Sequence, residues 1–297
     1  MKKHKAFSLI ELSIVILIIG ILIAGVTQAN RLVNKFKLTT ARTLTESSPV
    51  NSIKNLVAWY ETTSESSFKD SETNVNSGLS AWYDINPQST NKSNATQATT
   101  NNQPTYVLDK TSGLPMVYFN GNSSYFDLPD ATIPYGNSSF TIFIVSYPTS
   151  NDSFDKTFIS TEEVENQNNH IVRYRSNNSF NDVIFSATEG NEDFDHGGTP
   201  VVNKVFLEVS SYDNSTSILK SHRNGVAGNS ATLTHILTVS TVNNTIGVRK
   251  NTDGGVVGDW MFGNIGEIII FDRSLKDEER KAVENYLGKK WGITITN

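Results

Sequence analysis

One acidic side chain lies inside an otherwise apolar run near the start of the chain. Glu11 is the only charged residue between Lys5 and Arg31. The twenty residues from Phe7 to Val26 give about 30 Å of helix, the thickness of a bilayer core. A carboxylate in hydrocarbon costs a few kcal/mol, so such residues are usually paired or functional. The sequence predicts a membrane-spanning helix whose acid either has a partner or stays near the headgroups.

The residues before Glu11 offer such a partner. A short leader with three lysines precedes the apolar run. A cut between Ala6 and Phe7 would leave a positive α-amino group on Phe7, one helical turn before Glu11. A neighbouring copy would offer the same amine to the same acid. Glu11 would also lie in the first turn of the helix, where a negative charge opposes the macrodipole.

This arrangement resembles the type IV prepilin motif of pilins and type II secretion pseudopilins. The matching residues are the basic leader, a small residue at the cut, Phe7-Ser8-Leu9-Ile10-Glu11 and the apolar helix. The resemblance implies that a prepilin peptidase cuts before Phe7 and methylates its amine, and that Glu11 pairs with the amine of an adjacent subunit. The family usually has glycine where this chain has Ala6. An ordinary signal peptide is disfavoured because its apolar region is shorter. The main alternative is therefore an uncleaved single-pass anchor.

The composition limits what the rest of the chain can be. The chain has 297 residues, of which 37% are hydrophobic and 19% charged, and its net charge is −5. Beyond the first helix, about 250 residues remain, which suits one large β-domain or two small ones. The chain has no cysteine, which excludes disulfides, thiolate metal sites and a cysteine nucleophile. No basic patch with interleaved aromatic residues indicates contact with nucleic acid.

The helical pattern continues past the apolar run to about Leu44 and ends before Pro49. Beyond it, short runs of β-branched and aromatic residues alternate with turn residues, which predicts an antiparallel sandwich. The expected strands are 115–121, 139–148, 170–176, 182–188, 204–213, 217–225, 245–251 and 264–272. A final helix is expected over 275–291, with Ser274 and Asp277 as its capping box.

The β-rich part resembles the laminin-G-like, concanavalin A-like jelly-roll family. The segments that carry the resemblance include LVAWYE (56–61), GLPMVYFNG (113–121) and the closing FGNIGEIIIFDRSLKDEERKAVENYLGKKWGI. It implies a mainly β fold, an antiparallel jelly-roll sandwich with a long N-terminal transmembrane and stem helix and a short C-terminal helix. The expected organisation is a leader at 1–6, the transmembrane and stem helix at 7–45, a linker at 46–54 and the sandwich at 55–297. The fold hosts lectins, glucanases and structural modules alike, so it does not fix the function.

A glucanase of this fold needs acidic residues that alternate along one strand and point into one groove. The acidic loop around Glu192, Asp193 and Asp195 lacks the final acid of that pattern. Glu267 and Asp272 are five residues apart, so regular alternation places them on opposite faces of a strand. We therefore expect a protein that is not an enzyme.

The head contains two further candidate sites. Asp193 and Asp195 lie in a loop rich in oxygen ligands, which suits Ca²⁺, although such loops are mostly turns. Trp260 follows a glycine-rich turn and would stack on a sugar if it were exposed, with packing in the core or at an edge as the alternative. The histidines are scattered without ligand spacing.

Together the two resemblances imply a minor type IV pilin or type II secretion pseudopilin-like subunit with a lectin-like head for adhesion or for glycan or surface binding. Its expected partners are prepilin peptidase, other pilin subunits, the inner membrane, and a glycan or surface receptor. It would cross the inner membrane once, with its C-terminal domain in the periplasm or outside the cell, and would reach a pilus or the cell surface after assembly. The alternative is a membrane-tethered carbohydrate-binding module that never enters a filament.

Overall fold

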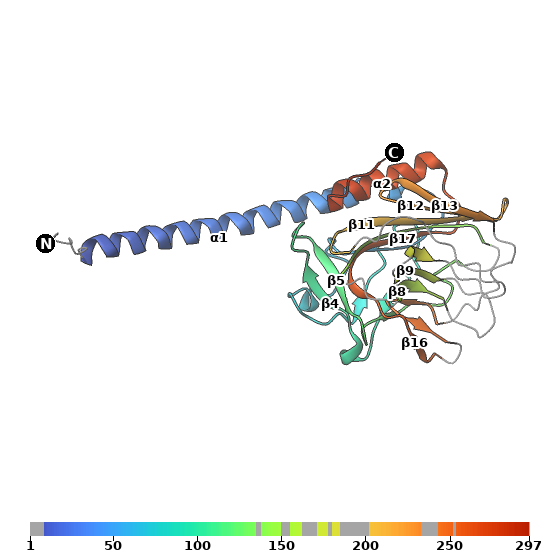
Figure 1. Ribbon diagram of the computed structural model, residues 1–297, viewed down its shortest axis with the longest axis horizontal. Helices are drawn as coiled ribbons and strands as arrows, with labels where there is room; N and C mark the ends of the chain where they lie inside the picture. Colours follow the sequence, from blue (N-terminus) through green and yellow to red (C-terminus); the bar gives the residue numbers. More distant parts are fainter. Residues whose placement is uncertain are drawn as a thin grey trace.

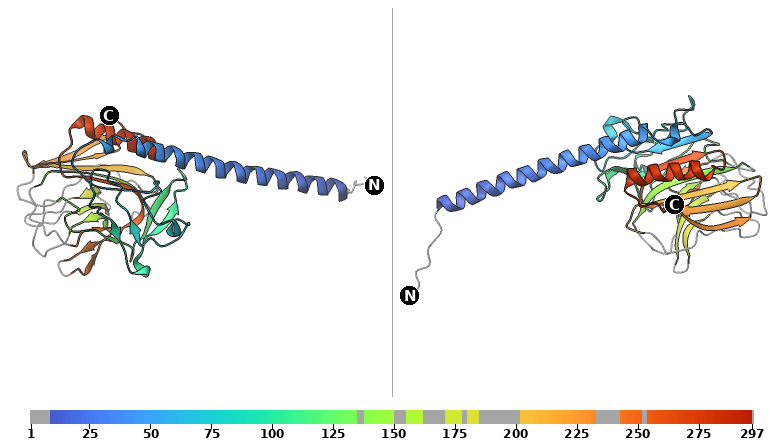
Figure 2. Two further views of the ribbon diagram at one scale, coloured as in Figure 1. Left: turned by 180° about the vertical axis from the view of Figure 1, so that it is seen from behind. Right: turned by 90° about the horizontal axis from the view of Figure 1, so that it is seen from above.

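A long helix projects from a β-rich head (Figure 1). The computed structural model describes residues 9–134, 138–149, 155–161, 171–177, 180–184, 202–232, 243–251 and 254–296. Helix α1 spans Leu9–Glu46; its N-terminal end is free of the head, and its C-terminal end lies beside α2, Asp277–Trp291 (Figure 2). This confirms the predicted fold: along the chain, a long N-terminal helix precedes the β-sandwich and a short C-terminal helix follows it.

The first sheet has eight strands in the order β13-β12-β11-β7-β17-β5-β4, and β1 also pairs with β17. Its pairings are all antiparallel. Its strands are β1 Leu56–Glu61, β4 Thr105–Leu108, β5 Pro115–Asn120, β7 Phe140–Pro148, β11 Phe206–Asp213, β12 Ile218–Arg223, β13 Val226–Thr232 and β17 Phe262–Phe271.

The second sheet has seven strands in the order β10-β9-β8-β14-β6-β3-β2. They are β2 Ala81–Trp82, β3 Ala95–Thr96, β6 Phe126–Asp127, β8 Asp155–Ser160, β9 Ile171–Asn177, β10 Phe180–Ile184 and β14 Thr245–Ile246. Strands β15 Arg249–Lys250 and β16 Val256–Gly258 form a small ladder of their own. The strand expected over 245–251 is therefore split into β14 and β15, at Gly247, whose φ of +95° suits glycine.

The main core lies between the two sheets. Phe119 and Phe140 from the first sheet and Phe126 and Phe158 from the second are fully buried in one cluster. Their inward positions follow from the alternation of side chains along each strand. This cluster joins the sheets into a sandwich.

A second core lies on the outer face of the first sheet. Phe143 and Phe271 of the sheet pack there with Ala41 of α1 and with Val283 and Leu287 of α2. The head therefore has three layers: a sheet, a second sheet and a layer of two helices (Figure 1). The end of the stem helix belongs to the folded head.

A bulge in β17 changes which way its side chains face. The register of β17 against β7 shifts between Ile265 and Glu267, so the bulge is at Gly266. Ile265 and Ile268 both lie in the core between the sheets, whereas Ile269 lies in the core beneath the helices. A bulge adds one residue and re-aims the side chains that follow. Glu267 consequently faces the helix layer.

The N-terminus of α2 differs from the predicted one. The backbone N–H of Leu275 donates to Thr141 Oγ1 at 2.9 Å, and Lys276 is still extended, with φ −65° and ψ 153°. The helix begins at Asp277, and Glu279 Oε2 accepts from the N–H of Lys276 at 3.0 Å. The capping box expected at Ser274 and Asp277 is wrong, because the contact with β7 keeps the chain extended for two more residues.

Substituting Gly266 with alanine is expected to lower the free energy of unfolding by about 1–3 kcal/mol, as overpacked cores do. A Cβ there would lie 2.6 Å from the ring of Trp291. Trp291 Nε1 is fixed by its 2.9 Å hydrogen bond to Glu267. Urea unfolding of the detergent-solubilised chain, followed by tryptophan fluorescence, measures the change. Gly20→Ala is the control because, outside the neighbouring backbone of its own helix, no described atom lies within 4 Å of its Cβ position. Equal stability of the two variants would contradict the prediction.

Candidate functional site

Helix α1 carries exposed apolar side chains along most of its length. Most of its large apolar residues are exposed, from 47% at Val15 to 85% at Leu9, whereas Leu38 and Leu44, near the head, are half-buried. Within the described residues, α1 is long and apolar enough to cross a membrane. Such a helix is unstable in water unless lipid or other helices cover it.

The residues expected for processing and assembly lie at the free end of α1. Ala6 and Phe7 fall outside the described residues. The backbone of Glu11 lies in α1, in the first turn that is described, while its side chain is outside the description. The roles of these three residues stay predictions.

The other end of α1 is bonded to the head. Arg42 Nε donates to the carbonyl of Thr63 at 2.7 Å, and its Nη1 pairs with Glu65 at 2.6 Å. The side chain of Glu65 is 80% exposed, so this ion pair adds little stability. The stronger attachment is buried and involves Thr45.

Two glutamates face each other directly beneath this attachment. Glu61 at the end of β1 is paired in register with Glu267 on β17. Like charges placed opposite one another in a sheet repel. Lys290 of α2 lies between them, with Nζ 2.7 Å from Glu61 Oε2 and 2.8 Å from Glu267 Oε2. All three side chains have 0% exposure, and the ammonium bridges the two carboxylates.

The stem joins the same cluster through Thr45. Lys290 Nζ donates to Thr45 Oγ1 at 2.8 Å, and the hydroxyl of Tyr286 lies 3.2 Å from that oxygen. Thr45 lies in the last turn of α1. One buried ammonium on α2 therefore contacts α1, β1 and β17. We call Thr45, Glu61, Glu267, Tyr286 and Lys290 the junction cluster.

Further hydrogen bonds compensate the excess of buried negative charge. Glu267 accepts from Trp59 Nε1 at 2.8 Å, from the Tyr286 hydroxyl at 2.7 Å and from Trp291 Nε1 at 2.9 Å. Glu61 accepts from the backbone N–H of Thr63 at 2.8 Å and from its hydroxyl at 2.7 Å. Buried charges are tolerated when their hydrogen-bonding capacity is filled in this way.

The protonation of the junction cluster follows from these contacts. Burial alone would raise the pKa of Glu61, but the charge of Lys290 and the hydrogen bonds from Lys290 and Thr63 outweigh it and lower that pKa. Burial would lower the pKa of Lys290, yet Glu267 and Glu61 raise it. Burial, followed by the charges of Glu267 and Glu61, raises the pKa of Tyr286. Both partners of the Glu61–Lys290 pair are therefore charged near neutral pH.

The junction cluster pairs two carboxylates, as glycoside hydrolases do, but its geometry serves attachment. Neither Glu61 nor Glu267 has exposed side-chain surface, and their oxygens are occupied by donors from the protein. A hydrolase needs open space between its acids for a sugar. The cluster fixes the angle between stem and head.

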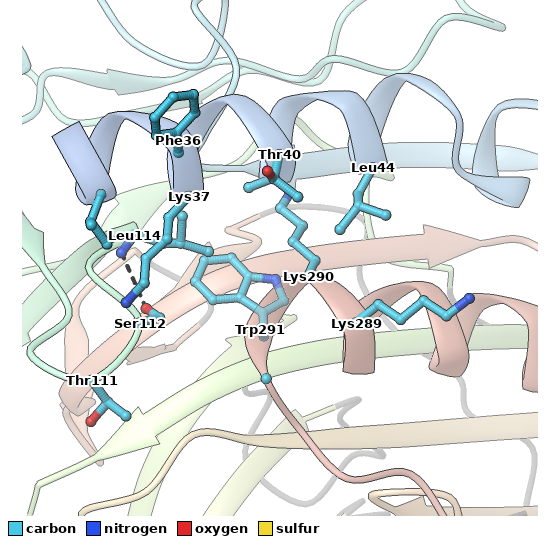
Figure 3. A pocket seen from close by; sticks show the side chains of 13 residues that line it. Phe36, Lys37, Thr40, Leu44, Thr111, Ser112, Leu114, Lys289, Lys290 and Trp291 are labelled. Atoms are coloured by element: carbon cyan, nitrogen blue, oxygen red, sulfur yellow. Dashed lines mark hydrogen bonds between the residues drawn. The ribbon is translucent and has the colours of Figure 1, made fainter.

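A groove of about 520 Å³ runs beside this junction, between α1 and α2. Figure 3 shows Phe36, Thr40 and Leu44 on α1 above Trp291 and Lys289 of α2. The loop with Thr111, Ser112 and Leu114 borders it. This stem groove continues the exposed apolar surface of α1 into the head.

Trp260 lies in a cluster on the other side of the sandwich. It is half-buried, and its ring centroid is 6.1 Å from that of Tyr125. Lys250 Nζ lies 4.7 Å from the centroid of Tyr125 and is ion-paired with Asp127. Packing at a core edge and stacking on a ligand both suit a ring in this position, so the binding role of Trp260 stays a prediction.

Asp193 and Asp195, expected to bind Ca²⁺, lie outside the described residues. Within the described ranges, no group of three or more histidine, aspartate or glutamate side chains is placed to hold a metal ion. The calcium site stays a prediction.

The sequence offered few signals for the junction cluster. Lys290 belongs to a run of two lysines near the C-terminus, which is typical of an exposed helix end. Glu61 closes the segment LVAWYE and was not a candidate. The only available signal was an acid in each of two strongly apolar strands, where charge needs a partner.

Comparison with known proteins identifies the head. Residues 120–279, more than half of the chain, match the concanavalin A-like lectin/glucanases superfamily, and the chain belongs to it. Residues 1–27 match the prokaryotic N-terminal methylation motif. The chain thus combines a prepilin-type N-terminus with a lectin-like jelly-roll domain. A search of curated proteins gives no match.

Two solved structures share the fold at low sequence identity. Domain 4 of AbnA, an extracellular GH43 arabinanase from Geobacillus stearothermophilus solved in complex with arabinotriose, superposes with a TM-score of 0.52 at 16% identity, over 77% of this chain and 97% of that domain. The binding domain of Paraclostridial Mosquitocidal Protein 1 gives a TM-score of 0.52 at 14% identity, over 80% of this chain and 55% of that one. At such identities the likeness concerns the fold alone.

Proposed function

We propose that the protein is a minor type IV pilin or pseudopilin-like subunit that displays a glycan-binding head. The observation that carries this proposal is the methylation motif at residues 1–27, continuous with an apolar helix that ends inside the head. A prepilin peptidase removes residues 1–6, and the stem stays in the inner membrane until the subunit is assembled. Glu11 then neutralises the amine of a neighbouring subunit.

The dimensions of the stem support this role. From Val26, the end of the apolar run, to Ala41, the first buried residue of the stem, α1 rises by about 22 Å at 1.5 Å per residue. The head therefore stands clear of the bilayer while the stem spans it. The stem groove, lined by Phe36 and Leu44 among others, would receive the stem helix of the adjacent subunit. A head this large would crowd a fibre made of identical copies, which favours a minor subunit.

Glycan binding by the head is supported by its superfamily and by the arabinotriose bound to the similar domain of the arabinanase. A head that binds sugars at the end of a rigid stem would serve adhesion. The same features fit a tethered carbohydrate-binding module that never enters a filament, and the state of the N-terminus separates the two.

The intact mass of the native protein tests the proposal. In cells with a prepilin peptidase, we expect the loss of Met1 to Ala6 and the gain of one methyl group on Phe7. Cells without the peptidase are the control and should keep the full leader. Retention of Met1 to Ala6 in both strains would contradict the pilin role and leave the tethered module.

A further inference from the structure

The outer face of the first sheet carries a second groove, of about 540 Å³. None of the described residues that line it belongs to α1 or α2, so it lies beyond the part of the sheet that the helices cover. Strands β4, β5, β7 and β17 form its floor, and Asn76 and Asn203 border it. We call it the sheet groove.

Three of its side chains form a row across the strands. Asn264 on β17 is in register with Tyr118 on β5 and with Tyr147 on β7. All three residues are half-buried, and they share the face on which Met116 and Tyr147 contact the core beneath the helices. Two strand spacings separate the tyrosines, which is about 10 Å. That distance is close to the length of a disaccharide unit in an extended chain.

The side chains of this row are free to contact a ligand. Among the described residues, none hydrogen-bonds the hydroxyl of Tyr118 or Tyr147 or the side-chain amide of Asn264. The ring of Tyr118 is held by an edge contact with Phe262, at 6.4 Å between centroids. Tyrosine offers an apolar face for the C–H groups of a sugar and a polar tip for its hydroxyls. The amide between them both donates and accepts hydrogen bonds.

The described lining of the sheet groove has no cluster of cations for an acidic ligand. Asp109 and Lys110 are the only charged residues among its described lining residues. The Asp109 carboxylate is already bonded to the N–H of Ser112 at 2.6 Å and to its hydroxyl at 2.8 Å. Recognition of carboxylated or sulfated sugars relies on arginine or on several cations. A single exposed lysine at the rim does not provide this.

We propose that the sheet groove binds an extended chain of neutral sugars that crosses β5, β17 and β7. Tyr118 and Tyr147 stack on alternate sugar residues, and the Asn264 amide hydrogen-bonds the residue between them. This inference rests on the glycan-binding role proposed above and deepens it, because it places the contact on the outer face of the first sheet instead of at Trp260.

Calorimetric titration of the detergent-solubilised full chain with oligosaccharides tests it. The probes are cellohexaose, xylohexaose, arabinohexaose and mannohexaose, with hexagalacturonate as the acidic comparison. At least one neutral hexasaccharide should bind more tightly than hexagalacturonate. Tyr118→Ala and Tyr147→Ala should each weaken that binding by about tenfold or more, as removal of a central aromatic contact does. Tyr118→Phe keeps the ring, so its affinity for the oligosaccharide should fall only a few-fold.

Tyr83→Ala is the matched control, because Tyr83 is also half-buried and does not line the groove. Unchanged thermal melting of each variant shows that its head is folded. Binding that survives in the Tyr118→Ala/Tyr147→Ala double variant but is lost in Trp260→Ala overturns the sheet groove and keeps glycan binding. Binding of hexagalacturonate alone, or of no neutral hexasaccharide, overturns the inference as well. The N-terminal mass is independent of all these outcomes, so the pilin role stands or fails separately.

Discussion

Replacing Lys290 with methionine is expected to lower the free energy of unfolding by about 3–5 kcal/mol, the usual effect of removing one partner from a buried ion pair. The variant keeps most of the side-chain volume but leaves Glu61 and Glu267 opposite each other without a cation. Thr45 also loses its bond to α2. Urea unfolding of the full chain in detergent measures the change, and a variant that fails to fold at all is the extreme of the same result.

The neighbouring lysine provides the control for this experiment. Lys289 lies on the same helix turn with its side chain exposed, so Lys289→Met should unfold at nearly the same urea concentration as the unaltered chain. If Lys290→Met behaved like Lys289→Met, the junction cluster would contribute little.

Glu11→Ala is expected to leave cleavage between Ala6 and Phe7 intact while reducing the amount of protein in sheared filaments by about tenfold or more. Loss of the acid leaves a neighbour's amine unpaired in an apolar setting, which costs a few kcal/mol. Immunoblots of filament and membrane fractions measure the distribution, and the intact mass of the membrane fraction reports cleavage.

Glu46→Ala is the matched control for incorporation. Glu46 is the acid at the opposite end of the same helix, and its side chain is exposed near the head. Its replacement should leave the filament fraction unchanged. Normal incorporation of Glu11→Ala would contradict the pairing role, whatever the result for Glu46→Ala.

Much of the architecture could be predicted because it depends on local patterns. The apolar run identified α1, and alternating β-branched residues identified strands such as β7 and β11 within a few residues. The helix expected over 275–291 matches α2, Asp277–Trp291, within two residues. These features depend on residues near each other in the sequence.

Glu267 shows where prediction failed. Regular alternation gave no reason to place it near another acid, but the bulge at Gly266 turns it toward the helix layer. Its partners Glu61 and Lys290 come from the two ends of the head's sequence, more than 200 residues apart. No local pattern reports which strands become neighbours or where a register shifts.

The row of Tyr118, Asn264 and Tyr147 was missed for a related reason. Each residue lies within a strand that was predicted, but none of the three was singled out from the sequence. Only the strand order β7-β17-β5 aligns them into one groove. A binding surface built across strands depends on the register between them.

The stretch after α1 was expected to be a linker, yet Val50 and Ile53 are buried in the core beneath the helices, and Thr45 is bonded to Lys290. The stem is therefore joined to the head through packed, hydrogen-bonded residues and not through a flexible linker. In the proposed adhesive role, a pull on the head would be transmitted to the membrane through the stem helix, and it would load the packed helix layer in shear. Because the end of the stem is packed against the head, the orientation of the head would follow that of the stem. If several subunits stood side by side with parallel stems, their heads would have the same orientation.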